Sequence, residues 1–187
     1  VLHALGPHAD PSRLVHHARE AGDVEALVTY APIAARAAVA AESTREAVAH
    51  VRLLDPHLED MPPDTAAAIL HEWAQQEFHL HDPLAGSLID RAITAFRTSG
   101  NKLDLGRTLA FSARINMQLL RTELALERAE EAVGILEHHS GTPEFAYALS
   151  TLAYVTWLYR EDVPSSLQIA ERALAVAEAS GDTYVQI

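Results

Sequence analysis

A repeat of about 40 residues is the feature that most restricts what this chain can fold into. A serine–glycine pair recurs at Gly100, Gly141 and Gly181, so successive glycines lie 41 and 40 residues apart. Each pair is followed at once by a residue of the kind that caps a helix start, and each is preceded by the end of an amphipathic helix. A period near 40 with two helices in each repeat indicates an α-solenoid of stacked helix hairpins.

The remaining sequence predicts helices joined by short turns. Asp10 and Asp82 each precede a proline, which combines a capping residue with proline at the first helical position. Ser43 and Glu46 have the spacing of a capping box. Helix ends are expected at four glycines: Gly22, Gly100, Gly141 and Gly181. The expected helices cover residues 10–21, 23–41 (kinked or restarted at Pro32), 44–56, 63–80, 83–98, 102–121, 123–139, 143–160 and 163–180.

These elements predict a single helical-repeat domain over residues 1–187. No stretch rich in proline, glycine or serine separates the helices. An N-terminal helix over residues 10–21 precedes the hairpins, which we expect at residues 23–58, 62–99, 102–140 and 143–181.

Small residues recur at the spacing of tetratricopeptide repeats. In that family, small side chains let the two helices of a hairpin nest together. The matching positions, at offsets of 12, 16 and 19 residues, are Ala113, Ala125, Ala129 and Ala132. The offset of 12 recurs from Ala35 to Ala47 and from Trp73 to Ala85, although Trp73 is large for such a position. The chain thus resembles a degenerate tetratricopeptide array, which implies an all-α fold: a right-handed α-solenoid of antiparallel helix hairpins.

A second resemblance lies in the N-terminal third of the chain. Residues 10–23 read DPSRLVHHAREAGD, residues 30–38 read YAPIAARAA, and residues 45–50 read REAVAH. This series resembles the junction in large ATP-binding regulators of the LuxR type, where the tetratricopeptide-like region follows the ATPase. The resemblance implies a parent chain with an N-terminal ATPase and a C-terminal helix-turn-helix, of which this chain would be the middle. ATP would then bind another domain, and this segment would carry no cofactor of its own.

The ends and the residue usage add to this expectation. Val1 is not a usual start, and Asp182 to Ile187 read as the opening of a further helix, so we expect a fragment of a longer chain. Its open ends would be able to self-associate, and the other domains of the same chain would be partners. Arginine supplies 13 of the 14 basic residues, which is typical of a high-GC bacterium such as an actinomycete. Such a regulator would be cytoplasmic.

Charge and composition exclude several classes of function. The net charge of −12 argues against binding to a phosphate backbone, so we expect no direct contact with nucleic acid. The single lysine, Lys102, lies between Asn101 and Leu103, so the phosphate loop GxxxxGK[ST] is absent, as is GxGxxG. The sequence lacks cysteine, and no apolar run approaches the roughly 20 residues of a membrane span.

The eleven histidines do not form a metal-binding motif. Residues 71–75 read HEWAQ, in which Gln75 replaces the second histidine of HExxH. On a helix, His79 and His81 would point about 200° apart. Acidic pairs such as those at residues 130–131 are expected on outward faces, and no serine lies in GxSxG. We therefore assign no metal ligand and no catalytic residue, and we do not expect an enzyme.

Repeat geometry places a candidate binding groove on two helices. Counting from Ala113 and Ala153 as the small positions, the side chains facing the concave groove should include those of Arg107, Arg114, Met117, Gln118, Tyr147, Tyr154 and Trp157. Arginines beside aromatic rings could hold an anionic peptide tail, an acidic ligand or a sugar-like molecule. Two other interpretations remain open. The arginines that recur every seven residues from residue 107 to residue 128 could be an exposed stripe paired with glutamates, and the aromatic residues could pack between helices.

These features are compatible with two functions. The first is a signal-sensing or protein-interaction segment of an ATP-dependent LuxR-type transcriptional regulator, with a small-molecule effector or a protein or peptide partner in the groove. The alternative is a tetratricopeptide-type adaptor that binds a partner's peptide and is not linked to transcription.

Overall fold

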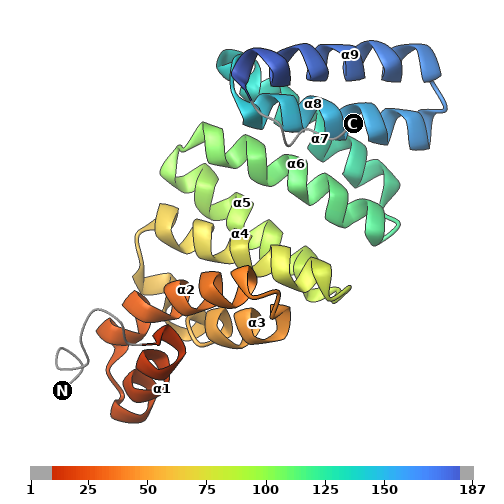
Figure 1. The fold of residues 1–187 in the computed structure, drawn as a ribbon. Helices are drawn as coiled ribbons and strands as arrows, with labels where there is room; N and C mark the ends of the chain where they lie inside the picture. Colours follow the sequence, from red (N-terminus) through yellow and green to blue (C-terminus); the bar gives the residue numbers. More distant parts are fainter. Residues whose placement is uncertain (1–9, 182–187) are drawn as a thin grey trace. The chain divides into compact units, whose positions relative to one another are not determined.

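The computed structural model describes residues 10–181 and is all-helical over that range, which confirms the predicted fold class (Figure 1). Successive helices run antiparallel within hairpins. The elements are α1 (Pro11–Ala21), α2 (Val24–Ala40), α3 (Thr44–Arg52), the 3₁₀ helix η2 (Asp55–Asp60), α4 (Pro63–His79), α5 (Leu84–Ser99), α6 (Lys102–Gln118), α7 (Thr122–Leu136), the 3₁₀ helix η3 (Glu137–His139), α8 (Pro143–Arg160) and α9 (Val163–Ser180). The further helix expected from Asp182 lies outside the described residues.

The chain forms two compact units, Val1–Ala85 and Gly86–Ile187. In the first unit, α1 packs on α2, α2 on α3, and α3 on α4. In the second unit, α6 packs on both α7 and α8, and α8 packs on α9. The division falls just after the start of α5, inside the hairpin expected at residues 62–99.

Aspartate, asparagine and threonine side chains cap several helices, and those of Asp10, Asn101 and Thr142 do so where the sequence predicts. The capped backbone N–H groups begin α1, α2, α6, α8 and α9, where the accepting side chains belong to Asp10, Asp23, Asn101, Thr142 and Asp162. The capping box predicted at the start of α3 is wrong, because Ser43 makes no side-chain capping hydrogen bond. The Glu46 carboxylate instead accepts a hydrogen bond from the Ser12 hydroxyl of α1, at 3.2 Å. A contact between helices has replaced a local one.

Three of the four predicted glycine stops are confirmed. Gly22, Gly100 and Gly181 have positive φ angles of 65°, 79° and 70°, which is the left-handed conformation that glycine adopts without a steric penalty. Gly141 differs: α7 ends earlier, at Leu136, and the chain continues as η3 before it reaches this glycine.

Two prolines act differently on their helices. The helix expected at residues 44–56 ends at Arg52, because Pro56 has no N–H to donate and its ring would clash with the preceding turn. Pro56 is instead the second residue of the separate helix η2, which begins at Asp55. Pro32, in contrast, lies inside α2, which continues to Ala40 without a restart. Tertiary packing holds α2 together, since its alanine-rich face is buried.

Small residues let the helices of the second unit approach closely, as the tetratricopeptide spacing predicts. Ala113, Ala125 and Ala129 are fully buried and form one cluster with Val155 of α8. In the first unit, Trp73 occupies one of the predicted small positions, yet only 3% of it is exposed. Within residues 10–181, each helix is too short or too polar to cross a bilayer.

The N-cap residue of α9, Asp162, is expected to ionise at an unusually low pH. Hydrogen bonds from the side chain and the backbone N–H of Ser165 lower the pKa of Asp162, and the nearby charge of Arg160 lowers it further. Because the pKa of Asp162 is lower in the folded state than in the unfolded state, its ionisation stabilises the fold at any pH above the unfolded pKa, which is roughly 4. This stabilisation is lost as the pH falls through the folded-state pKa. An NMR titration should therefore find Asp162 ionised below the range of an ordinary exposed aspartate. A titration at or above that range would contradict the cap.

Candidate binding face on α6 and α8

The structure places all seven predicted groove residues on two packed helices of one unit. Four of them lie on α6, namely Arg107, Arg114, Met117 and Gln118. The other three lie on α8, namely Tyr147, Tyr154 and Trp157. The two helices pack directly against each other, so residues of both can line the same surface.

Arg114 and Tyr147 join the two helices. The Arg114 guanidinium donates to the Tyr147 hydroxyl, with 3.4 Å between Nη1 and Oη. This is a long and therefore weak hydrogen bond. Arg114 is exposed, and no carboxylate within residues 10–181 forms an ion pair with it. Its positive charge thus remains available to an anionic ligand.

Tyr154 and Trp157 form an exposed aromatic pair on α8. Their ring centroids are 5.8 Å apart with an angle of 31° between the ring planes, and 52% and 50% of the two residues are exposed. Tyr147 lies seven residues before Tyr154, so both tyrosines project from the same side of the helix. Tryptophan, tyrosine and arginine are enriched among the residues that carry binding energy in protein interfaces, so an exposed pair of aromatic rings is a candidate binding surface.

The remaining three predicted residues have other surroundings. Arg107 forms an ion pair with Asp104 on its own helix, with 3.0 Å between Nη2 and Oδ1. Met117 is half-buried and packs against the alanine cluster of the second unit. Gln118 is exposed at the end of α6. The structure forms two pairs from this set, Arg114 with Tyr147 and Tyr154 with Trp157, which share α8. These four residues are here called the aromatic face.

The interpretation of the recurring arginines as a paired stripe describes part of this set. Arg128 contacts both Asp90, at 3.7 Å, and Glu131, at 3.4 Å. Arg107 likewise has its aspartate partner. Arg114 departs from this pattern because its described partner is a phenol and not a carboxylate. The same heptad spacing therefore produces two paired arginines, Arg107 and Arg128, whereas no carboxylate within residues 10–181 forms an ion pair with Arg114 or Arg121.

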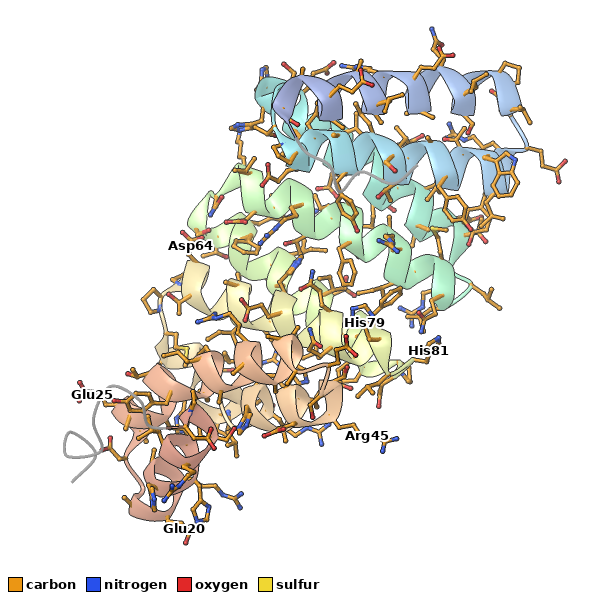
Figure 2. All side chains as sticks on the ribbon, in the orientation of Figure 1. Glu20, Glu25, Arg45, Asp64, His79 and His81 are labelled. Atoms are coloured by element: carbon orange, nitrogen blue, oxygen red, sulfur yellow. The ribbon has the colours of Figure 1, made fainter. Side chains whose placement is uncertain are left out.

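The histidine-rich segment has no metal-binding arrangement in the part of the chain that the structure describes. His71 is buried on α4, and the neighbouring Glu72 pairs with Arg36. His79 and His81 lie at the C-terminal end of α4, where both are exposed (Figure 2). Among residues 10–181, no three histidine or carboxylate side chains gather closely enough to hold an ion.

Sequence reasoning missed a pocket in the first unit. A cavity of about 200 Å³ lies between α2, α3 and α4. Its lining residues are Ala35, Arg36, Val39, Val51, Glu72, Gln75 and Gln76. One signal could have pointed to it: Arg36 follows the small residue Ala35 just as Arg114 follows Ala113.

Comparisons with known proteins bear on the fold. No protein-family model and no curated protein matches this sequence. Among solved structures, a variant of a kinesin light chain-like protein of Podospora anserina with nearly identical TPR-like repeats has a TM-score of 0.69 at 16% identity, covering 94% of this chain and 99% of that one. The same protein without that variation gives a TM-score of 0.66 at 17% identity, covering 90% and 97%. BtubC (BKLC) from P. vanneervenii gives 0.69 at 18% identity, covering 92% and 82%. These likenesses show the fold: the chain is built of TPR-like, that is tetratricopeptide-like, helical repeats.

Proposed function

We propose that this protein is a protein-interaction module that binds a partner's peptide on the aromatic face. The TPR-like fold is one that generally binds protein or peptide partners, and the aromatic face supplies a surface suited to that role. The observation that carries the proposal is the exposed pair of Tyr154 and Trp157 on α8, the helix on which Tyr147 contacts Arg114, an arginine without a carboxylate partner within residues 10–181.

The chemistry of the face specifies the partner. The Arg114 guanidinium would bind a carboxylate, and a hydrogen bond to a charged group contributes about 1.5–3 kcal/mol. The rings of Tyr154 and Trp157 would bury an apolar or aromatic side chain of the same peptide. Because the chain carries a net charge of −12, it repels an acidic peptide at long range, so the arginine must act in direct contact. A short peptide with one acidic and one aromatic residue fits these demands.

We further propose that the module is the signal-sensing segment of an ATP-dependent LuxR-type transcriptional regulator. The support is the resemblance of residues 10–50 to the junction in such regulators. A partner bound to the aromatic face would shift the equilibrium of the adjoining ATPase by its difference in affinity for the two states. The full gene tests this assignment: a phosphate loop upstream and a helix-turn-helix downstream are expected. A gene that encodes neither would leave an interaction adaptor not linked to transcription.

Peptide binding is expected to depend on the aromatic pair. Peptides selected from a random library against the full chain should contain an acidic and an aromatic residue. Trp157→Ala and Tyr154→Ala should each weaken the best peptide by about 30-fold, the effect typical of a buried aromatic anchor. Anisotropy of a fluorescein-labelled peptide measures the affinity of every variant, Trp157→Ala included. The emission of the half-exposed Trp157 reports binding independently in the chains that keep it, because the other tryptophan, Trp73, is buried.

A matched control distinguishes binding at the aromatic face from nonspecific binding to exposed apolar residues. Leu120→Ala removes a leucine that is 85% exposed in the turn after α6 and is expected to leave binding unchanged.

Arg114→Gln should reduce affinity for acidic peptides by about tenfold or more and abolish the preference for them. Selected peptides that bind equally well to Trp157→Ala and Tyr154→Ala would disprove the proposed site.

A further inference from the structure

The pocket of the first unit has an apolar floor. Ala35 and Val51 line it and are almost completely buried, whereas Val39 is 44% exposed. Its volume of about 200 Å³ exceeds the roughly 150 Å³ cavity that holds a benzene molecule, so it has room for one aliphatic side chain. The aromatic face belongs to the other unit, so this pocket is a separate feature.

Opposite charges meet at the edge of this pocket. The Arg36 guanidinium and the Glu72 carboxylate are 3.4 Å apart, and 61% and 38% of their side chains are exposed. An ion pair that is this long and this well hydrated contributes little to folding. Arg36 and Glu72 can therefore separate and each bind a charged group of a ligand at little cost to the stability of the fold.

Two amides also line the pocket without partners of their own. Gln75 and Gln76 are both half-buried on α4. Neither makes a side-chain hydrogen bond within the described residues 10–181. Each amide keeps two donors and an acceptor for a ligand.

We propose that this pocket binds a small zwitterionic molecule with an apolar side chain, of the class of free aliphatic α-amino acids. Arg36 would bind the carboxylate, Glu72 the ammonium group, and the floor of Ala35, Val39 and Val51 the side chain. The amides of Gln75 and Gln76 would accept and donate the remaining hydrogen bonds. An internal peptide segment carries neither terminal charge, so it would use only the amides and the floor.

A comparison of the two units supports a ligand with both charges. Arg36 and Arg114 occupy equivalent positions, one residue after a small residue, and each reaches a neighbouring helix. Arg114 meets the neutral hydroxyl of Tyr147, which leaves a net positive surface. Arg36 meets the carboxylate of Glu72, which leaves a pair of opposite charges. The same repeat position thus presents a site for an anion in one unit and a site for a zwitterion in the other.

Titration of the intact chain with L-leucine, followed by amide chemical shifts, tests the proposal. Saturable binding with shifts confined to α2, α3 and α4 is expected. N-acetyl-L-leucinamide, which lacks both charges, should bind about tenfold more weakly or worse, as should 4-methylpentanoate and isopentylamine, which each lack one charge. Absence of saturable binding to L-leucine would overturn the proposal. Equal binding of the capped analogue would also overturn it and assign the pocket to an internal peptide segment.

Single substitutions assign the two charges. Arg36→Gln and Glu72→Gln should each weaken L-leucine binding about tenfold or more while the far-ultraviolet circular dichroism stays unchanged, because both side chains are largely exposed. The matched control is Arg97→Gln, which removes an ion pair with Glu131 between helices of the other unit. Binding should be unchanged in that variant. Loss of binding in Arg97→Gln to the same extent would show that the charges act nonspecifically and would overturn the proposal.

Discussion

Gly106→Ala is expected to lower the free energy of unfolding of the second unit by about 1–3 kcal/mol, although alanine favours helices over glycine by about 1 kcal/mol. A Cβ atom at Gly106 would lie 2.7 Å from both Cδ atoms of Leu136 and closer still to its Cγ. Leu136 is fully buried and so has no solvent-filled space to move into. The methyl group must therefore push α6 and α7 apart.

The same substitution elsewhere provides the control. Gly134 is an exposed residue of α7, and a Cβ atom added to it would meet nothing within 4 Å. Gly134→Ala should therefore stabilise the second unit by about 0.5–1 kcal/mol. Urea unfolding followed by ¹⁹F resonances of 5-fluorotryptophan resolves the units, because Trp157 lies in the second and Trp73 in the first.

A double substitution tests the cause of the Gly106 effect. Leu136→Ala alone should cost about 2–5 kcal/mol by leaving a cavity. Combined with Gly106→Ala, it should cost less than the two single effects together, since the new methyl group occupies part of that cavity. Additive costs, or stabilisation by both glycine replacements, would show that the contact between α6 and α7 is not tight.

Glu77→Ala is expected to destabilise the first unit by about 2–4 kcal/mol. Glu77 is only 1% exposed, and its Oε1 accepts a hydrogen bond of 2.8 Å from the indole Nε1 of Trp73. The same oxygen lies 3.5 Å from Nη2 of Arg52, which is mostly exposed. Truncation leaves the buried indole N–H without an acceptor and opens a void beside the ring.

Glu77→Gln separates the hydrogen bond from the charge. Glutamine still offers a carbonyl oxygen to the indole of Trp73, and the lost attraction to Arg52 is partly screened by water, so the cost should stay below about 1 kcal/mol. Glu59→Ala, at an exposed position of η2, should change stability by less than about 0.5 kcal/mol. If Glu77→Gln proved as damaging as Glu77→Ala, the hydrogen bond to the indole would not explain the effect.

The candidate face was predictable to the extent that repeat geometry controls it. The spacing from Ala113 places Arg114 on the side of α6 that meets α8. The structure shows that its partner there is Tyr147, which the heptad spacing of the arginines alone does not specify. Met117 shares the expected groove position but packs inward, because a small rotation of a helix decides whether a borderline position faces the core or water. The pocket of the first unit escaped prediction for a related reason: its residues come from three helices.

By itself, the sequence determined the all-α class, the hairpin repeat and most helix ends, because these depend on residues within one or two turns of each other. The tertiary structure alone decided which polar side chains become partners. Ser12 with Glu46, Arg36 with Glu72, and Arg114 with Tyr147 join residues 34, 36 and 33 positions apart on different helices. Such contacts depend on how each helix is rotated against its neighbour, which the packing of whole faces fixes and no local spacing encodes.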